Sequence, residues 1–199
     1  MAQQNYMRKA TYLHEKVYRE IRYQRDEINF NEFESCVFER CDFSQSNFID
    51  VTFIDCKFLG CNFNGAKINH VAFRGVFFSD CQMKDVNFAM CDKLIFEISF
   101  KDCILDFSKF YTLKLKATTF TDCSLIAVDF MEADLTNVLF DHCDLYRTLF
   151  MKSILDKADF TTSFNYTLDP SKNKIQKAMF SREGVKGLLS KHEIIVVDI

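Results

Sequence analysis

The sequence contains no apolar run that approaches the roughly 18 residues of a membrane-spanning helix. Its first residues, MAQQNYMRKATY, lack the apolar core of a secretory signal, so we expect a cytoplasmic protein without membrane segments. Tryptophan is absent, and the 199 residues include one proline and five glycines. The net charge of −3 gives no global reason to expect direct binding of nucleic acid.

Residue patterns that build catalytic or metal sites are also missing. The few glycines form no phosphate-binding loop. The histidines are His14, His70, His142 and His192, and no two of them have the spacing of metal ligands. No nucleophile stands in a pattern with a base and an orienting group. The sequence therefore predicts neither an enzyme nor a protein that holds a metal or another cofactor.

What the sequence has in excess is phenylalanine, with 23 residues. A large apolar residue occupies every fifth position from Phe33 to Phe88 and again, two residues late, from Ile95 to Phe160. The period fails across residues 89–94, and in the second run Phe alternates with Leu or Ile. An α-helix repeats its faces every 3.6 residues and a strand every 2, so neither element explains a period of five.

The position two residues before each large residue is nearly always small or compact, and all nine cysteines fall on this phase of the period when Cys91, at the break, is included. These are Cys36, Cys41, Cys56, Cys61, Cys81, Cys91, Cys103, Cys123 and Cys143. We interpret them as small buried apolar residues. An odd number of cysteines without a secretory signal favours reduced thiols, and disulfides between stacked cysteines are the alternative.

The pattern of one small and one large inward residue in every five resembles the pentapeptide-repeat family over residues 28–165. The resemblance implies an all-β fold, a right-handed quadrilateral β-helix with one pentapeptide per side and about twenty residues per coil. Cysteines spaced by twenty, such as Cys41, Cys61 and Cys81, agree with that coil length. The break at 89–94 divides the β-helix into two runs.

The open ends of a β-helix are exposed edges that need covering. We expect residues 1–27 to form an irregular N-terminal cap, with a short helix as the alternative. Residues 166–199 are expected to form a C-terminal cap with a short helix and a probable dimerisation segment. In it, Asp169-Pro170 resembles a helix start, residues 181–191 a short helix, and residues 193–199 an apolar strand-like tail.

Acidic residues dominate the repeats. Residues 30–165 hold 20 Asp and Glu against 13 Lys and Arg, whereas both flanking segments are mildly basic. Such a rod would present charge where a DNA-binding protein expects phosphates, although an acid before the large residue is also explained as repeat consensus. The predicted acidic face consists of Asp102, Asp122, Asp129, Asp134, Asp141, Asp144 and Asp159.

A second predicted surface is apolar. Tyr111, Met131 and Met151 recur every twenty residues directly after a large residue, and Ile126 and Tyr146 recur on the adjacent side. An outward apolar column predicts a docking strip, and tolerated apolar surface is the alternative.

Within the family, the chain resembles the group that acts on type II topoisomerases, which includes the Qnr-type quinolone-resistance proteins and the microcin B17 immunity protein. The likeness rests on the units FERCDF, FIDCKF, FKDCIL, FTDCSL and FDHCDL and on the ending LDPSKNKIQKAMFSREGVKGLLSKHEIIVV. It implies a DNA mimic that binds DNA gyrase or topoisomerase IV and modulates it or protects it from a quinolone or a peptide toxin. A protein-interaction scaffold with another partner is the alternative.

The same likeness implies a homodimer joined end to end through the C-terminal segment. The implied interface residues are Val185, Leu188, Leu189, Ile194 and Ile195. The runs 33–88 and 95–160 lack the inserted loops of many Qnr proteins, so the chain is more similar to the loopless members of the group.

Overall fold

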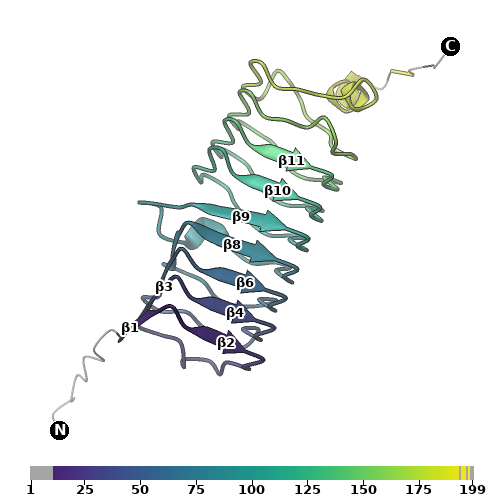
Figure 1. Ribbon diagram of the computed structural model, residues 1–199. Coiled ribbons are helices and arrows are strands. Elements are labelled where there is room, and N and C mark those ends of the chain that lie inside the picture. The colour runs from purple at the N-terminus through teal and green to yellow at the C-terminus, as the bar shows by residue number, and fades with distance from the viewer. Residues whose placement is uncertain (1–10, 193, 196, 198–199) are drawn as a thin grey trace, which may run out of the picture.

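The computed structural model describes residues 11–192, 194, 195 and 197. Over this range the chain winds into a rod of stacked coils, with the first coil at one end and a short helical segment across the other (Figure 1). Parallel strands form one sheet of four and one of seven. The strands are β1 (Thr11–His14), β2 (Val17–Arg19), β3 (Asn31–Glu34), β4 (Val37–Glu39), β5 (Thr52–Ile54), β6 (Lys57–Leu59), β7 (Ala72–Arg74), β8 (Val76–Ser79), β9 (Ile98–Lys101), β10 (Thr119–Thr121) and β11 (Leu139–Asp141).

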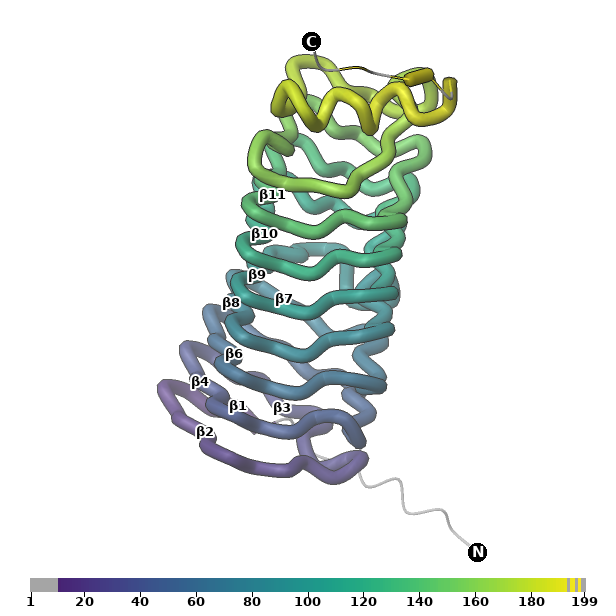
Figure 2. Tube along the Cα trace, turned by 90° about the vertical axis from the view of Figure 1, so that its right-hand side faces the viewer, coloured from purple at the N-terminus to yellow at the C-terminus, as the bar shows by residue number. Residues whose placement is uncertain are grey.

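Each strand pairs in parallel with a strand one coil away. The register is twenty residues in pairs such as Phe38 with Phe58, and isolated bridges such as Asp129 with Leu149 continue the pairing on other sides. Viewed from the side, the coils lie one above another as closed turns of similar size (Figure 2). The predicted right-handed quadrilateral β-helix is confirmed, because a five-residue period places one large residue inside each side of the coil.

We number the four sides of a coil by the large residues that they point inward. The first side carries Phe33, Phe53 and Phe73, the second Phe38, Phe58 and Phe78, the third Phe43, Phe63 and Met83, and the fourth Phe48, Ile68 and Phe88. In the second run, leucines such as Leu115 and Leu125 take the first and third sides, and phenylalanines the second and fourth.

The core consists of aromatic stacks that run along the rod. The rings of Phe38 and Phe58 lie 4.8 Å apart between centroids and nearly parallel. Neighbouring stacks meet edge to face, as Phe58 and Phe63 do at 5.2 Å. Both arrangements are favourable for aromatic rings, and each buried ring removes a large apolar area from water. These stacks are therefore the main stabilising feature of the rod.

The corners turn through a residue with positive φ, two positions after the inward residue. Glycine meets this need at Gly60 and Gly65, with φ values of 65° and 77°. Aspartate occupies the same kind of position at Asp50, Asp55, Asp80, Asp85, Asp102 and Asp122. Asp and Asn adopt this left-handed conformation more readily than other residues with side chains. The backbone itself therefore favours acidic residues at the corners.

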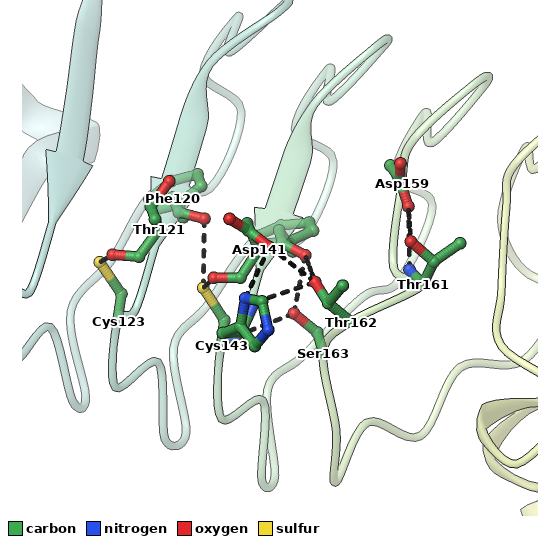
Figure 3. Close-up of polar contacts among 11 residues, drawn as sticks. Phe120, Thr121, Cys123, Asp141, Cys143, Asp159, Thr161, Thr162 and Ser163 are labelled. Carbon is green, nitrogen blue, oxygen red and sulfur yellow. Dashed lines mark hydrogen bonds and ion pairs between the residues drawn. The ribbon is translucent and has the colours of Figure 1, made fainter.

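The cysteines are free thiols, and all nine are buried. Their sulfurs contact backbone carbonyls of the same coil and of the coil below. Cys61 Sγ lies 3.3 Å from the oxygen of Phe38, and Cys143 Sγ lies 3.3 Å from that of Phe120 (Figure 3). Burial raises the pKa of the Cys56 thiol to about 12. We infer that the cysteines serve as small core residues, because a buried protonated thiol is chemically inert.

The break in the period is a two-residue lengthening of one first side. The sequence predicts that the second run starts with Ile95 inside, but the structure places Phe96 inside, 8% exposed, while Ile95 is 45% exposed. Phe96 packs edge to face on Phe73. Side chains alternate between the two faces of an extended segment. Ile98 of β9 points inward, so Phe96, two residues earlier, points inward as well. The register across the break is consequently 22, with Phe78 opposite Phe100.

Regular coils extend beyond residues 28–165 at both ends. β1 pairs with β3 and β2 with β4, so coil geometry is present from Thr11 instead of an irregular cap. At the other end, bridges join Ile154 to Lys174 and Asp159 to Met179.

The helical cap that the sequence predicts is present as 3-10 helices. They are η2 (Gly184–Leu188) and η3 (Ser190–His192), and a third, η1 (Phe88–Met90), lies at the break. The predicted helix start at Asp169-Pro170 is wrong, because residues 170–172 form a turn. The carboxylate of Asp169 accepts hydrogen bonds from the backbone and the hydroxyl of Ser171, which closes this turn.

Candidate interaction surfaces

One corner of the rod gathers carboxylates into a row. Asp80, Asp102 and Asp122 occupy the same left-handed corner position, after the second side, in three successive coils. Backbone hydrogen bonds join them to the adjacent coils, with Asp102 N donating to the oxygen of Thr121 and Asp122 N to that of Asp141, both one coil higher. We call Asp80, Asp102, Asp122 and Asp141 the acidic corner.

The row is exposed and uncompensated. Asp80, Asp102 and Asp122 are exposed, and none of them forms an ion pair with another residue of the described range. Like charges one strand apart repel each other. The corner backbone therefore holds carboxylates together in an arrangement that is electrostatically unfavourable.

The acidic corner ends at Asp141. Its Oδ1 lies 2.7 Å from Nδ1 of His142 and accepts a hydrogen bond from the hydroxyl of Thr162 at 2.9 Å (Figure 3). Toward the N-terminal end, Glu20 and Arg40 occupy the same corner, and they form an ion pair at 2.7 Å. Uncompensated charge is therefore confined to the middle coils.

The other predicted acidic residues do not join this row. Asp129, Asp134, Asp144 and Asp159 lie on the fourth, first, third and second sides of the coils, respectively. Each accepts a hydrogen bond from the backbone N–H two residues later, such as that of Met131 for Asp129 at 2.9 Å. Such a contact is a turn-forming role of aspartate. The seven predicted acidic residues therefore do not form one face. Asp102, Asp122 and Asp141 belong to the acidic corner, and the other four are turn residues on separate sides of the rod.

Asp134 allows a test of the turn role. Burial alone would raise its pKa, but hydrogen bonds from Thr136 and the ammonium of Lys116 hold the pKa below its usual value. We expect Asp134→Ala to lower the free energy of unfolding by about 1 kcal/mol, because a turn acceptor is lost. Asp134→Asn, which retains an acceptor, should cost less.

The stabilising role of Asp134 depends on pH. A depressed pKa in the folded state contributes stability above the unfolded pKa of about 4 and loses it as the pH falls through the lower folded value. Urea unfolding at several pH values should therefore show the difference between wild type and Asp134→Asn shrinking below about pH 4. A difference that does not change with pH would contradict an ionised role.

The apolar strip predicted from the sequence comprises Tyr111, Ile126, Met131, Tyr146 and Met151, of which the first three are half-buried. They lie on the fourth side and the corner before it, and Tyr146 and Met151 are 48% and 43% exposed. Phe107 and Leu149, 56% and 49% exposed, extend this surface. The guanidinium of Arg147 lies over the ring of Tyr146. The acidic corner lies between the second and third sides, so the third side separates it from the strip.

Three residues of these surfaces, Asp80, Phe107 and Leu149, could not be predicted from the twenty-residue spacing of the coils. Asp80 lies 22 positions before Asp102, because the break adds two residues. Phe107 stands at a left-handed corner with a φ of 63°, an unusual position for an aromatic residue. Leu149 precedes an inward residue where most repeats have polar ones. A register of 22 across the break would have placed Asp80 in the same row as Asp102.

The C-terminal segment closes the last coil. Leu188 packs against the core, and Val185 is 41% exposed. Gly187 lies so close to Tyr166 that a Cβ would sit 2.2 Å from its backbone oxygen, so glycine is required there. Of the other predicted interface residues, Leu189 is half-buried. Ile194 and Ile195 are 54% and 90% exposed.

The described residues contain neither a membrane-spanning helix nor a cluster of metal ligands. No helix in them is long and apolar enough to cross a membrane. No group of three or more His, Cys, Asp or Glu side chains in that range is arranged to hold a metal ion.

Comparison with known proteins agrees with the coil geometry. The sequence profile of the pentapeptide repeat region matches residues 31–94 and 93–165. No curated protein matches the chain in sequence.

Solved structures share the fold. Two trypsin-treated variants of QnrB1, a plasmid-mediated fluoroquinolone resistance protein, match with TM-scores of 0.70 and 0.62 at 15% and 14% identity, covering 93% and 94% of this chain and 99% and 100% of theirs. HetL, a pentapeptide repeat protein involved in heterocyst differentiation regulation in a Nostoc cyanobacterium, matches with a TM-score of 0.66 at 10% identity over 86% of each chain. The chain belongs to the pentapeptide-repeat family.

Proposed function

We propose that the protein is a non-enzymatic, cytoplasmic binding protein whose acidic corner mimics DNA on a type II topoisomerase, DNA gyrase or topoisomerase IV. The observation that carries the proposal is the row of Asp80, Asp102 and Asp122, exposed and without ion-pair partners in the described range. Stacked coils lie about 4.8 Å apart, and one DNA strand carries a charge every 3.4 Å or so. The row would thus meet a basic DNA-binding surface with a comparable series of charges.

The fold supports this proposal. QnrB1, which shares the coil architecture over nearly the whole chain, is a fluoroquinolone resistance protein. On that basis we propose that binding modulates the topoisomerase or protects it from a quinolone or a peptide toxin. The rod would bind the enzyme and not nucleic acid itself, because its own repeats are acidic.

A supercoiling assay with purified gyrase, with and without a fluoroquinolone, tests the proposal. We expect the protein at low micromolar concentration either to inhibit supercoiling or to restore it in the presence of the drug. Neither effect at that concentration would overturn the proposal.

The apolar strip favours a second candidate function, a scaffold that docks an unrelated protein. HetL, with the same fold, is involved in differentiation regulation, so the fold serves more than one role. Under the topoisomerase proposal, Met131→Asp combined with Met151→Asp should leave the supercoiling effect within about twofold of wild type, because the third side separates the strip from the acidic corner. Loss of the effect in a folded variant would favour the scaffold.

We also propose that two copies pair end to end through the outer face of η2, around Val185 and Leu189. Leu188 contributes less, because it packs inward on its own coil. A closed two-fold pair is the commonest oligomer. Light scattering of the purified protein should give a dimer mass, and Val185→Asp should shift it toward the monomer. A monomeric wild type would contradict the pairing.

A further inference from the structure

On the fourth side of the rod, the hydrogen bonds between coils end earlier than on the other three sides. In the coil below, Phe130 N donates to the oxygen of Leu149 at 3.0 Å, and Leu149 N donates to that of Val128 at 2.8 Å. The equivalent groups one coil higher are the N–H of Phe150 and the C=O of Thr148. Neither of these two groups has a hydrogen-bond partner in the part of the chain that the structure describes.

The cause is that the next coil does not pair along its fourth side, where Thr167, Leu168 and Asp169 line a hollow instead. The chain leaves the ladder after Phe164, which pairs with Leu145 and Cys143, and it rejoins the ladder at Lys172, whose oxygen accepts a hydrogen bond from Lys152 N. Thr148 and Phe150 are 3% and 7% exposed, and a buried backbone group without a partner is costly. The fourth side above these residues is therefore an open strand position.

A hollow of about 280 Å³ lies beside this position. Leu149, Met151 and Leu168 give it apolar walls, and Lys172 and Lys191 stand at its rim. For comparison, an apolar cavity of about 150 Å³ holds a benzene ring. The open strand position thus adjoins space for apolar side chains.

The chain itself carries an apolar segment next to the hollow. Ile194, Ile195 and Val197 are 54%, 90% and 75% exposed. They follow Lys191, whose ammonium is fixed at the hollow by Asp169 Oδ1 at 2.6 Å and by the hydroxyl of Ser171. An extended chain advances about 3.3 Å per residue, so residues 194–197 are long enough to cross Leu149–Met151.

We propose that residues 194–197 dock in this open position of their own chain as an added strand. The segment would pair with the N–H of Phe150 and the C=O of Thr148 and place aliphatic side chains in the hollow, the mode by which extended peptides add to sheet edges. Its flanking residues Glu193 and Asp198 are acidic, and the hollow is lined by the basic residues Lys172 and Lys191. Because the tail starts at the hollow, docking within one chain costs less entropy than capture of a second copy.

This docking assigns Ile194 and Ile195 a role different from end-to-end pairing, and it goes beyond the proposed function. The docked segment would cover Met131 and Met151, both of which line the hollow. A partner of the apolar strip would then have to displace the tail.

Hydrogen exchange read by mass spectrometry tests the docking. We expect the peptide that contains Phe150 to exchange about tenfold faster in the double variant Ile195→Asp, Val197→Asp than in the wild type, because the added strand is lost. Leu94→Asp with Ile95→Asp, which changes two exposed apolar residues at the break, is the matched control and should leave that peptide unchanged. Equal exchange in wild type and double variant would overturn the proposal.

A photo-crosslinker at position 195 identifies the occupant. With benzoylphenylalanine there and protein at low micromolar concentration, we expect crosslinks to residues 148–151 in the band of monomer mass. Crosslinks to the same peptide confined to a dimer band would show a second copy in the position and overturn docking within one chain, as would crosslinks elsewhere. Neither measurement involves a topoisomerase, so its outcome is independent of the proposed function.

Discussion

Replacing Phe120 by alanine is expected to lower the free energy of unfolding by about 3–5 kcal/mol. The ring is fully buried on the second side of the rod. It stacks on Phe100 and Phe140 at centroid distances of 5.2 and 5.3 Å, and it meets Phe110 and Phe130 edge to face. The coils above and below are fixed by the β10 ladder, so the structure cannot collapse into the space, and the cavity cost is added to the lost burial.

Urea unfolding followed by circular dichroism measures this loss. Thr121→Ala is the matched control, because Thr121 follows Phe120 in β10 but points outward and is only half-buried. We expect its effect to stay within about 0.5 kcal/mol. A loss below 1 kcal/mol or so for Phe120→Ala would mean that the aromatic stack is not the main stabilising feature of the rod.

The fold follows from the sequence because its period is a steric requirement. A side of five residues has room inside for one large and one small side chain, so the phenylalanines that keep the period of five and the nine cysteines mark the inward positions. The inward residue at the break was not predictable in the same way. Ile95 keeps the period by count, but Phe96 is inside because alternation along the strand from Ile98 decides it.

The ends show the same limit. Thr11 and Ile21 do not fit the small position of the repeat, and yet residues 11–30 form a coil, because hydrogen bonds to β3 and β4 are available there. Asp169-Pro170 has the residues of a helix start, but Ser171 offers the aspartate a closer partner in a turn. In these segments pairing with the neighbouring coil outweighs local preference.

The acidic surface was predictable in kind but not in extent. The spacing of twenty correctly brings Asp102 and Asp122 together, and their place two residues after an inward residue separates them from Asp129 and Asp159, which directly precede one. The spacing does not reveal which carboxylates accept backbone hydrogen bonds. That distinction depends on φ and on side-chain direction, which a repeat pattern does not contain.

Reversing the charge of the acidic corner is expected to have the largest effect on function. In the triple variant Asp80→Lys, Asp102→Lys, Asp122→Lys, the row that would attract a basic surface repels it instead. We expect the concentration needed for the effect on gyrase supercoiling to rise by about 100-fold, because like charges facing each other across an interface cost several kcal/mol. The variant should fold, since Lys152 and Lys157 occupy the same left-handed corner position with φ values of 57° and 59°.

The matched control uses the same substitution at other corners. Asp50 and Asp55 share the left-handed corner conformation, with φ values of 49° and 50°, but they belong to corners other than the acidic one. Asp50→Lys with Asp55→Lys changes the net charge in the same direction, by two thirds as much as the triple variant, so it separates the local row from the overall field. Raised salt should weaken the wild-type effect, because exposed charges are screened within about 10 Å at 0.1 M. If both variants lose the effect equally, net charge alone acts; if neither loses it, the acidic corner is not the contact, and the apolar strip becomes the surface that binds the partner.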